Sequence, residues 1–256
     1  MSEATGIYAL WYREFKVFLR EKSRIVSSII NPILWFLIIG GGIGSSISFG
    51  KINYQTFIFP GILIQTALFS SIFFGVYIVW DKKIDFLKEV LVAPISRTSI
   101  FVGKILGGST DALIQISILL VIGVAFVQTG IITGLNLSIA SVLTSMAFMF
   151  VAIVGLVSIG LIIGSQMESP EGFQLISSFL IFPMFFLSGA LFPINNLPPW
   201  IATFTFLDPM TYAVDGLRGV LVGISQFQIY FDFLVVSAFS FVMVLIGIFA
   251  IKRMKL

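Results

Sequence analysis

Five long stretches without a charged residue constrain the fold of this chain more than any other feature of its sequence. They run from Ile25 to Ser46, Gln55 to Trp80, Ala112 to Met167, Gly172 to Leu207 and Phe233 to Ile251. A transmembrane helix needs about 20 consecutive apolar residues to cross roughly 30 Å of hydrocarbon. Each stretch reaches about that length or exceeds it, so we expect a membrane protein that crosses the bilayer several times.

The stretch after Ala112 is long enough for two crossings, and the turn-forming sequence QTGIITGLN at residues 128–136 divides it. Only 11% of the residues are charged, against roughly a quarter in soluble domains. The sequence therefore predicts an all-α, polytopic membrane protein whose residues 1–256 form a single transmembrane domain. The six predicted transmembrane helices cover residues 25–47, 55–80, 103–127, 137–164, 172–192 and 231–251.

Lysine and arginine are distributed unevenly between the two sides of this six-helix arrangement. Thirteen of the 15 lie in the N-terminal segment, the loop between the second and third helices, and the C-terminal tail; Lys51 and Arg218 lie on the other side. Because basic loops remain in the cytoplasm, we predict a multi-pass protein of the cell (inner) membrane with both termini cytoplasmic. Orientation and anionic lipid headgroups account for the basic charge, so no nucleic-acid partner is expected.

The sequence excludes several kinds of chemistry. Cysteine and histidine are both absent, which removes Cys/His metal sites, thiol nucleophiles and imidazole bases. The two Gly-Lys pairs, at Gly50-Lys51 and Gly103-Lys104, lack the upstream glycine of a phosphate-binding loop. We therefore predict no catalytic residue, no metal site, no cofactor and no nucleotide hydrolysis in this chain.

The N-terminal segment, residues 1–24, is predicted to form a helix that lies in the membrane interface. Aromatic residues recur there at helical spacing, and cationic residues occupy another face. The helix could be a simple membrane anchor or could rest on a cytoplasmic partner. The residues predicted to define it are Trp11, Tyr12, Arg13, Phe15 and Lys16.

A compact amphipathic segment lies in the loop formed by residues 81–98. Read as a helix, it has an apolar stripe, with Lys88 and Glu89 outside that stripe. Pro94 predicts the end of this helix, and Ser96 or Thr98 could cap the next one. The segment could rest on lipid as a connector, or could insert into a soluble partner. The predicted stripe consists of Phe86, Leu87, Val90 and Leu91.

Residues 193–228 contain too many prolines for another crossing and are predicted to form short amphipathic helices on the outer side. Asp208 followed by Pro209 predicts a helix N-terminus, and Gly223 predicts its end. Asp215 and Arg218, three residues apart, are expected to pair on the polar face. The residues assigned to this region are Pro198, Trp200, Asp208, Pro209, Tyr212, Asp215 and Arg218.

Two further hypotheses remain open on the residues alone. Asp111 near the start of the third predicted helix could serve an ion-coupled secondary transporter, or it could cap a polar cluster with Ser109, Thr110 and Gln115. A lipid-modifying enzyme would have to use scattered acidic residues, of which Glu168 and Glu171 are the closest pair. A solvated loop is the plainer interpretation of these two glutamates.

Three stretches together resemble the membrane-spanning permease subunit of ABC transporters of the type-2 exporter class. They are SRIVSSIINPILWFLIIGGGIG, FLKEVLVAPISRTSIFVGKIL and SGALFPINNLPPWIATFTFLDPMTYAVDGLRG. The resemblance implies that the segment after the second span is a coupling helix. Phe86, Leu87, Val90 and Leu91 would be its docking face on a separate ATP-binding subunit, with Lys88 and Glu89 at the border.

The resemblance also implies the assembly. Two ATP-binding subunits carrying ATP and Mg would join this chain and a second permease copy, as a homodimer or a heterodimer, among membrane lipids. The N-terminal helix would rest on the ATP-binding subunit, and the helices near residues 193–222 would close the outer end as a re-entrant pair. The cargo would be amphiphilic, hydrophobic, or polysaccharide- or lipid-like. The sequence DKKIDF replaces the Glu-Arg run of many relatives, which puts specific ion pairs with the ATPase in doubt.

Overall fold

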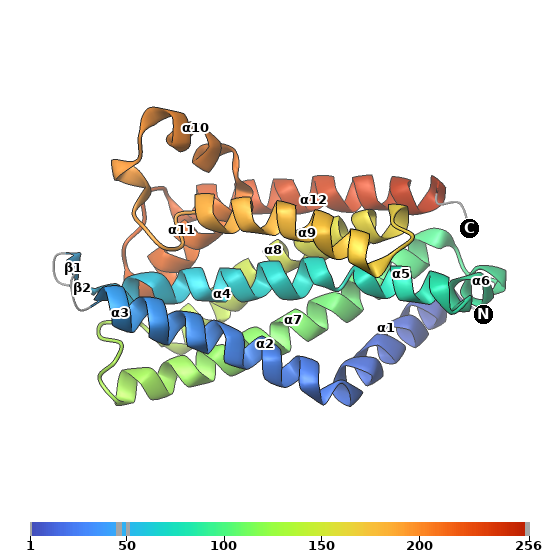
Figure 1. The fold of residues 1–256 in the computed structure, drawn as a ribbon, viewed down its shortest axis with the longest axis horizontal. Coiled ribbons are helices and arrows are strands. Elements are labelled where there is room, and N and C mark those ends of the chain that lie inside the picture. The colour runs from blue at the N-terminus through green and yellow to red at the C-terminus, as the bar shows by residue number, and fades with distance from the viewer. Residues whose placement is uncertain (1, 45–47, 50–51, 254–256) are drawn as a thin grey trace.

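The computed structural model describes residues 2–44, 48, 49 and 52–253, and shows a bundle of long helices lying side by side (Figure 1). The helices are α1 Glu3–Arg20, α2 Lys22–Trp35, α3 Gly41–Gly44, α4 Tyr54–Phe73, α5 Val76–Lys83, α6 Phe86–Val92, α7 Arg97–Gln128, α8 Ile139–Gln166, α9 Pro170–Leu187, α10 Pro199–Leu207, α11 Pro209–Val222 and α12 Ile229–Arg253. A π-helical turn at Phe36–Gly40 joins α2 to α3, and a 3₁₀ turn covers Ile194–Asn196. β1, Ser48–Phe49, pairs with β2, Ile52–Asn53, in an antiparallel ladder.

The prediction of six membrane-spanning helices is confirmed. Six helices in the described part of the chain are long and apolar enough to cross a membrane: Lys22–Gly40, Tyr54–Lys83, Arg97–Gln128, Ile139–Gln166, Pro170–Leu187 and Ile229–Arg253. The turn expected between the third and fourth helices is present, and its Gly130 and Gly134 have φ angles of 76° and 79°. The predicted end of the first span at residues 45–47, together with Lys51 and Lys255, lies outside the described residues.

The centre of the bundle is α4, which packs against α7, α8, α9 and α11. Its residues are buried on nearly every side, from Thr56 to Leu68. By contrast, α12 packs mainly on α8 and leaves most of its apolar side chains exposed, including Phe241 and Phe249. Exposed apolar side chains on a helix of this length are what a lipid-facing position requires. Among the described membrane-spanning helices, the span that begins with α4 is therefore the most buried, and the others leave a larger part of their surface exposed.

The α4–α5 junction and α8 touch through their backbones. The spacing of Gly160 and Gly164 predicts close helix packing, and a methyl group at Gly160 would lie 2.3 Å from the carbonyl oxygen of Ile72. A methyl group at Gly164 would lie equally close to the carbonyl oxygen of Gly75, at 2.3 Å. Larger residues cannot occupy these positions without separating the helices. The glycine pair thus serves packing within one chain.

At the opposite end of the bundle from α6, α11 is buried rather than exposed on the surface. Asp208 caps α11 through a 2.9 Å hydrogen bond from the Met210 amide, and Gly223 ends the helix with φ of 79°, so both predicted boundaries are confirmed. The predicted pairing of Asp215 with Arg218 is wrong, since no ion pair joins them in the described structure. The helix is not an amphipathic surface element either, because both side chains are buried with the apolar ones.

Backbone groups take the place of the expected ion pair. Asp215 accepts hydrogen bonds from the amides of Gln226, at 2.8 Å, and Phe227, at 2.9 Å. Arg218 donates to the carbonyl oxygen of Gly189 at 2.8 Å, and its guanidinium lies 3.9 Å from the ring centroid of Phe57. Each charged group therefore fastens a different loop or helix end to α11. Backbone groups elsewhere in the fold are favoured over the predicted Asp215–Arg218 ion pair, because several hydrogen bonds can stabilise a buried charge more fully than one side chain can.

Asp208 makes the folding stability of the protein depend on pH. Burial raises the pKa of Asp208 to about 7, although the hydrogen bond from Met210 opposes the shift. An unfolded aspartate titrates near roughly 4, so the folded chain holds an extra proton between about pH 4 and 7, and stability falls as the pH rises through that range. Asp208→Asn keeps the helix cap and removes this titration. We expect the melting temperature of the variant relative to wild type to increase by a few degrees from pH 5 to pH 8.

Thermal unfolding in detergent micelles at several pH values measures this difference. A difference in melting temperature that stays constant between pH 5 and pH 8 would contradict the role given to Asp208.

Candidate functional site

The candidate site lies at the end of the bundle where α6, the beginning of α1 and the end of α12 come together (Figure 1). We call this the α6 end. It contains α6 itself, an ionic cluster formed by Arg13, Glu14, Asp81 and Lys104, and a charged cavity beside α6. The three parts are built from four segments that are distant in the sequence.

The short helix α6 is formed by strong local signals. Asp85 precedes it with φ of 57°, a left-handed conformation that aspartate tolerates better than most residues. The helix ends at Val92 before Pro94, and Ser96 caps α7 by accepting a 3.1 Å hydrogen bond from the Ser99 amide. The predicted end of α6 is confirmed, and of the two predicted caps, Ser96 and Thr98, the structure uses Ser96. As a result, α6 is held within a few residues of two membrane-spanning helices.

The face that α6 presents differs from the predicted apolar stripe. Leu87 is 2% exposed and belongs to the hydrophobic core of the chain, so it cannot contact a partner in this conformation. Val92, by contrast, is 86% exposed, and Lys88 and Glu89 are exposed as well. Phe86 and Val90 are half-buried, and the Leu91 side chain lies outside what the structure describes. The outer face of α6 is therefore formed by Lys88, Glu89 and Val92.

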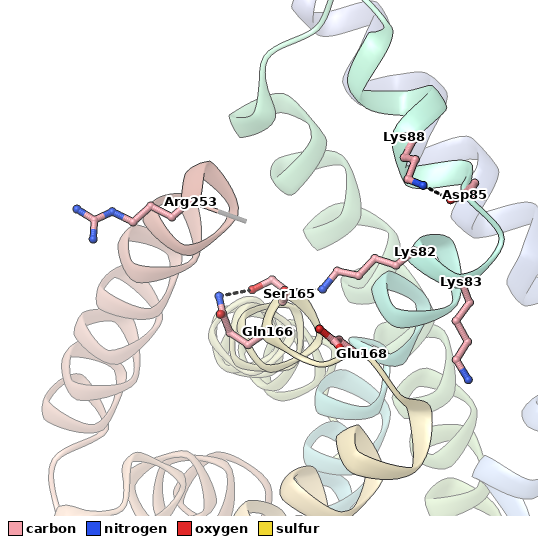
Figure 2. A pocket seen from close by; sticks show the side chains of 8 residues that line it. All are labelled: Lys82, Lys83, Asp85, Lys88, Ser165, Gln166, Glu168 and Arg253. Carbon is pink, nitrogen blue, oxygen red and sulfur yellow. Dashed lines mark hydrogen bonds and ion pairs between the residues drawn. The ribbon is translucent and has the colours of Figure 1, made fainter. Parts of the chain in front are cut away.

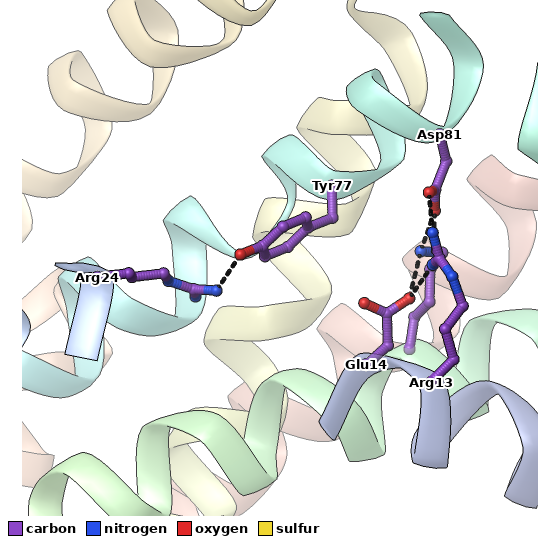
Figure 3. Close-up of polar contacts among 6 residues, drawn as sticks. Arg13, Glu14, Arg24, Tyr77 and Asp81 are labelled. Carbon is purple, nitrogen blue, oxygen red and sulfur yellow. Dashed lines mark hydrogen bonds and ion pairs between the residues drawn. The ribbon is translucent and has the colours of Figure 1, made fainter. Parts of the chain in front are cut away.

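The ionic cluster lies directly beneath α6 and joins three helices. Asp81 of α5 accepts from Arg13 of α1 at 2.6 Å and from Lys104 of α7, also at 2.6 Å. Glu14 of α1 accepts from the same two cations, at 2.8 Å from Arg13 and 3.0 Å from Lys104. Figure 3 shows the Arg13 guanidinium between the two carboxylates. Two cations and two anions thus alternate in one closed arrangement.

Burial makes this arrangement energetically demanding. Glu14, Asp81 and Lys104 are each 2% exposed or less. Burying an ion costs several kcal/mol, and only a close counter-ion with good hydrogen bonds offsets that cost. For Arg13, burial would lower the pKa, but the hydrogen bond and charge of Asp81, assisted by Glu14, raise it above its ordinary value. Arg13 therefore stays charged and binds α1 to α5.

Close packing and an aromatic contact connect the cluster to its surroundings. Gly107 lets α1 approach α7, since a methyl group there would lie 2.6 Å from the Glu14 Cβ. The Arg13 guanidinium also lies 3.9 Å from the ring centroid of Phe86, the first residue of α6. A displacement of α6 would thus disturb a cation–π contact with the same arginine that bridges the two carboxylates.

A second polar group lies deeper, along α2, α5 and α7. Arg24 donates to the Tyr77 hydroxyl at 2.5 Å (Figure 3), and Tyr77 in turn donates to Glu21 at 2.5 Å. The Asp111 carboxylate lies 3.6 Å from Arg24. The predicted cluster of Asp111 with Ser109, Thr110 and Gln115 is therefore wrong, since Asp111 pairs with Arg24 and Thr110 accepts a hydrogen bond from Trp11.

The helix α1 packs along α7 through a face that the sequence reading did not identify. Its buried residues are Gly6, Leu10, Glu14 and Phe18, spaced four apart. The aromatic residues predicted for the membrane interface lie beside that face: Trp11 stacks on Phe15 at 5.8 Å and donates to Thr110 at 2.9 Å. Tyr12 is exposed, with the Lys16 amine 4.6 Å from its ring centroid.

A cavity of about 490 Å³ opens next to α6, and Figure 2 shows the side chains around it. Lys82 and Lys83 come from α5, Ser165 and Gln166 from α8, and Arg253 from the end of α12. The Lys82 amine donates to the last carbonyl oxygens of α8, those of Gly164 at 3.1 Å and Ser165 at 2.5 Å. The remaining lining residues are Asp85, Lys88 and Glu168. Four basic and two acidic side chains therefore surround the cavity, which favours an acidic partner surface.

The residues predicted for the outer region lie at the opposite end of the molecule (Figure 1). Trp200 of α10 is 69% exposed, while Tyr212 of α11 donates to the Phe206 carbonyl oxygen at 2.9 Å. Pro198 precedes α10, and Pro209 is the first residue of α11. The predicted site residues therefore form two groups at the two ends of the bundle, and only those of the N-terminal and loop segments meet one another.

The ionic cluster was missed by sequence reasoning, although signals for it were present. Glu14 interrupts an otherwise apolar face of α1, and Lys104 lies within a membrane-spanning helix. Charges in such positions are expected to pair with one another. The charge distribution assigns Lys104 to the cations of the loop between the second and third spans, whereas in the structure its side chain is buried, at 1% exposed.

Residues 5–222 of the chain match the family described as ABC-2 type transporter. The chain belongs to the ABC-2 type transporter family. Because the described part of this ABC-2 type chain also contains six helices able to cross a membrane, the chain is a multi-pass membrane protein and a permease subunit of an ABC exporter. The ion-coupled carrier suggested by Asp111 receives no support from this assignment.

The relatives of this ABC-2 type chain include two named as transport permeases and one named as a nodulation protein. It is 28% identical over 219 residues to the putative transport permease ycf38 of Cyanophora paradoxa, covering 83% of this chain and 72% of that protein. It is 26% identical over 242 residues to the inner membrane transport permease YadH of Escherichia coli, covering 91% and 90%. It is 23% identical over 224 residues to nodulation protein J of Neorhizobium galegae, covering 84% and 80%.

Two aspartate-to-asparagine substitutions in this ABC-2 type chain compare the stability contributed by the buried cluster with that of an exposed ion pair. Asp81→Asn leaves Lys104 and Arg13 to share Glu14, and we expect it to destabilise the fold by about 3–5 kcal/mol because buried charge loses its partner. Asp85→Asn removes only the exposed pair with Lys88, 2.6 Å long, and should cost at most about 1 kcal/mol. Thermal and denaturant unfolding in detergent micelles measures both.

Equal, small losses of stability in the two variants would show that the four charges do not hold the α6 end together.

Proposed function

We propose that this chain couples ATP hydrolysis in a separate ATP-binding subunit to export through the membrane, and that α6 is where the force enters. The observation that carries the proposal is the arrangement at the α6 end: the helix has an exposed outer face, and its first residue, Phe86, contacts Arg13 of the ionic cluster. Two ATP-binding subunits with ATP and Mg, and a second permease copy, would complete the transporter. ABC-2 type family membership supports an ATP-binding partner.

The outer face of α6 suits a protein partner. Val92 is 86% exposed outside the membrane-spanning segments, and Lys88 and Glu89 flank it. The cavity beside α6 adds Lys82, Lys83 and Arg253 to the same end. An exposed apolar side chain within a charged rim is a common form of protein interface. An acidic edge of the ATP-binding subunit would complement the basic rim and could accommodate Val92.

The chain's own contacts determine what a push on α6 would move. Phe86 contacts Arg13, which bridges α1 to α5, and Lys104 adds α7 to the same cluster. These helices include the end of the second span and the beginning of the third. Movement of the ATP-binding subunits would therefore displace two spans and α1 together, biasing the chain between two arrangements of its helices.

The proposal requires the α6 end to be cytoplasmic, and this can be tested without background labelling because the chain contains no cysteine. We expect a membrane-impermeant thiol reagent to label Ser225→Cys in intact cells, since Ser225 is exposed at the opposite end. Glu89→Cys should be labelled only after permeabilisation. Labelling of Glu89→Cys in intact cells would reverse the orientation and remove the basis for ATP-driven coupling at α6.

Docking is tested by a substitution on the outer face of α6. We expect Val92→Asp to lower the ATPase activity that copurifies with the tagged chain roughly tenfold, because a charge at the centre of a contact removes much of its binding energy. Ile224→Asp provides the control, since Ile224 is also an exposed aliphatic residue outside the spans but lies at the other end. ATPase activity that copurifies undiminished with Val92→Asp would refute docking through this face.

A further inference from the structure

A small polar hollow lies within the membrane-spanning part of the bundle, between α2, α4 and α7. Its volume is about 50 Å³. The lining residues are Ser28, Asn31, Pro32, Gln65, Thr66, Phe69, Ser70 and Gln115. Gln65 and Gln115 lie near the middle of the long helices that carry them. Amides at that depth are costly unless they find hydrogen-bond partners.

The side chains in this hollow lack such partners. Within the described structure, the amide nitrogen and oxygen of Gln115, the amide oxygen of Gln65 and the hydroxyl of Ser70 make no hydrogen bond. Gln65 is 4% exposed and Gln115 is 1% exposed. Buried polar atoms are almost always paired, so several unpaired ones meeting at one hollow indicate a missing partner. The hollow offers both donors and acceptors to that partner.

An apolar groove lies next to the hollow. The groove has a volume of about 300 Å³ and is lined by Asn31, Leu34, Trp35, Ile38 and Ile39 of the first span. Asn31 lines both spaces. Leu34 and Ile38 are exposed, so the groove opens to the outside of the bundle. A polar pocket and a larger apolar one therefore meet at Asn31.

We infer that the hollow and the groove together bind an amphiphile with an uncharged, hydrogen-bonding head group, such as a hydroxyl or an amide, and a hydrocarbon tail. The inference rests on the proposed export function and names the class of compound that would be carried. The head occupies the hollow, where Gln65, Gln115 and Ser70 donate to it and accept from it. The tail lies along Leu34, Trp35 and Ile38.

The size and charge of the two spaces favour a small, neutral head group. The hollow, at about 50 Å³, is much smaller than the groove, at about 300 Å³, so the compact polar end of an amphiphile suits the hollow and its tail suits the groove. The eight described lining residues are all uncharged. An ionic head group would lose its water shell there and find no counter-ion among the lining residues. The head group must therefore be small and neutral.

Trp35 provides a direct measurement, because it lines the groove. The full chain, reconstituted in phosphatidylcholine vesicles without an ATP-binding subunit, is titrated with spin-labelled alkyl chains that end in a hydroxyl, a carboxylate or a quaternary ammonium group. Quenching of tryptophan fluorescence is recorded, and Trp35→Phe gives the background from the other three of the four tryptophans. We expect saturable, Trp35-dependent quenching by the alcohol, with at least about tenfold weaker binding of the two charged probes.

Substitutions in the hollow test the role of the amides. Gln115→Leu should weaken binding of the alcohol about tenfold, as expected for the loss of hydrogen bonds to the head group. Its melting temperature should equal or exceed that of the parent, because no native hydrogen bond is lost. Gln128→Leu makes the same change at the exposed end of the same helix and should leave binding unaltered. If Gln115→Leu does not fold, Ser70→Ala should still weaken binding.

Equal quenching by all three probes would overturn the inference, because it would mean that the groove takes any lipid-like chain. Unchanged affinity in Gln115→Leu, or in Ser70→Ala where the first variant does not fold, would also overturn it. Since no ATP-binding subunit is present, these results are independent of the docking test on Val92. A chain that binds the alcohol without recruiting an ATPase, or the reverse, would separate the two proposals.

Discussion

The structure depends above all on the pairing of charged side chains that are buried away from water. An ion buried away from water must find a close counter-ion and good hydrogen bonds. The alternating arrangement of Arg13, Glu14, Asp81 and Lys104 meets that demand at the α6 end, and it does so with residues from three different helices. A cluster of this kind holds together only if all three helices stay in place. The segments that it unites are also those that surround the proposed docking face.

Local sequence signals were sufficient for the spans and for most helix ends. Charge-free stretches predict the six crossings because hydrocarbon thickness sets the length of a membrane helix. Ser96 and Asp208 predict helix N-termini because a side-chain oxygen satisfies an unpaired backbone amide directly beside it. Such signals act over three or four residues, so they do not depend on which helices become neighbours. For that reason the predicted spans and helix ends agree closely with those in the structure.

The inward-facing residues of the functional region were harder to predict. Leu87 and the face of α1 containing Glu14 became buried because α5 and α7 lie against them, and no local pattern specifies those neighbours. Asp215 and Arg218 show the same limit, since spacing favours a pair whereas the fold offers each one backbone partners. Gln65 and Gln115 can be recognised in the sequence as polar residues within predicted spans. That they line one hollow could not be predicted, because it depends on how α2, α4 and α7 pack together.

The backbone contact of Gly160 and Gly164 with the α4–α5 junction has a mechanical consequence. Interlocked side chains must change rotamer or separate before two helices can tilt, whereas the two glycines of α8 carry no side chain that would have to move at this contact. A tilt of α5 relative to α8 is therefore least obstructed at this junction. Such a tilt would move the α6 end and the part of α4 that packs on α11 in opposite directions.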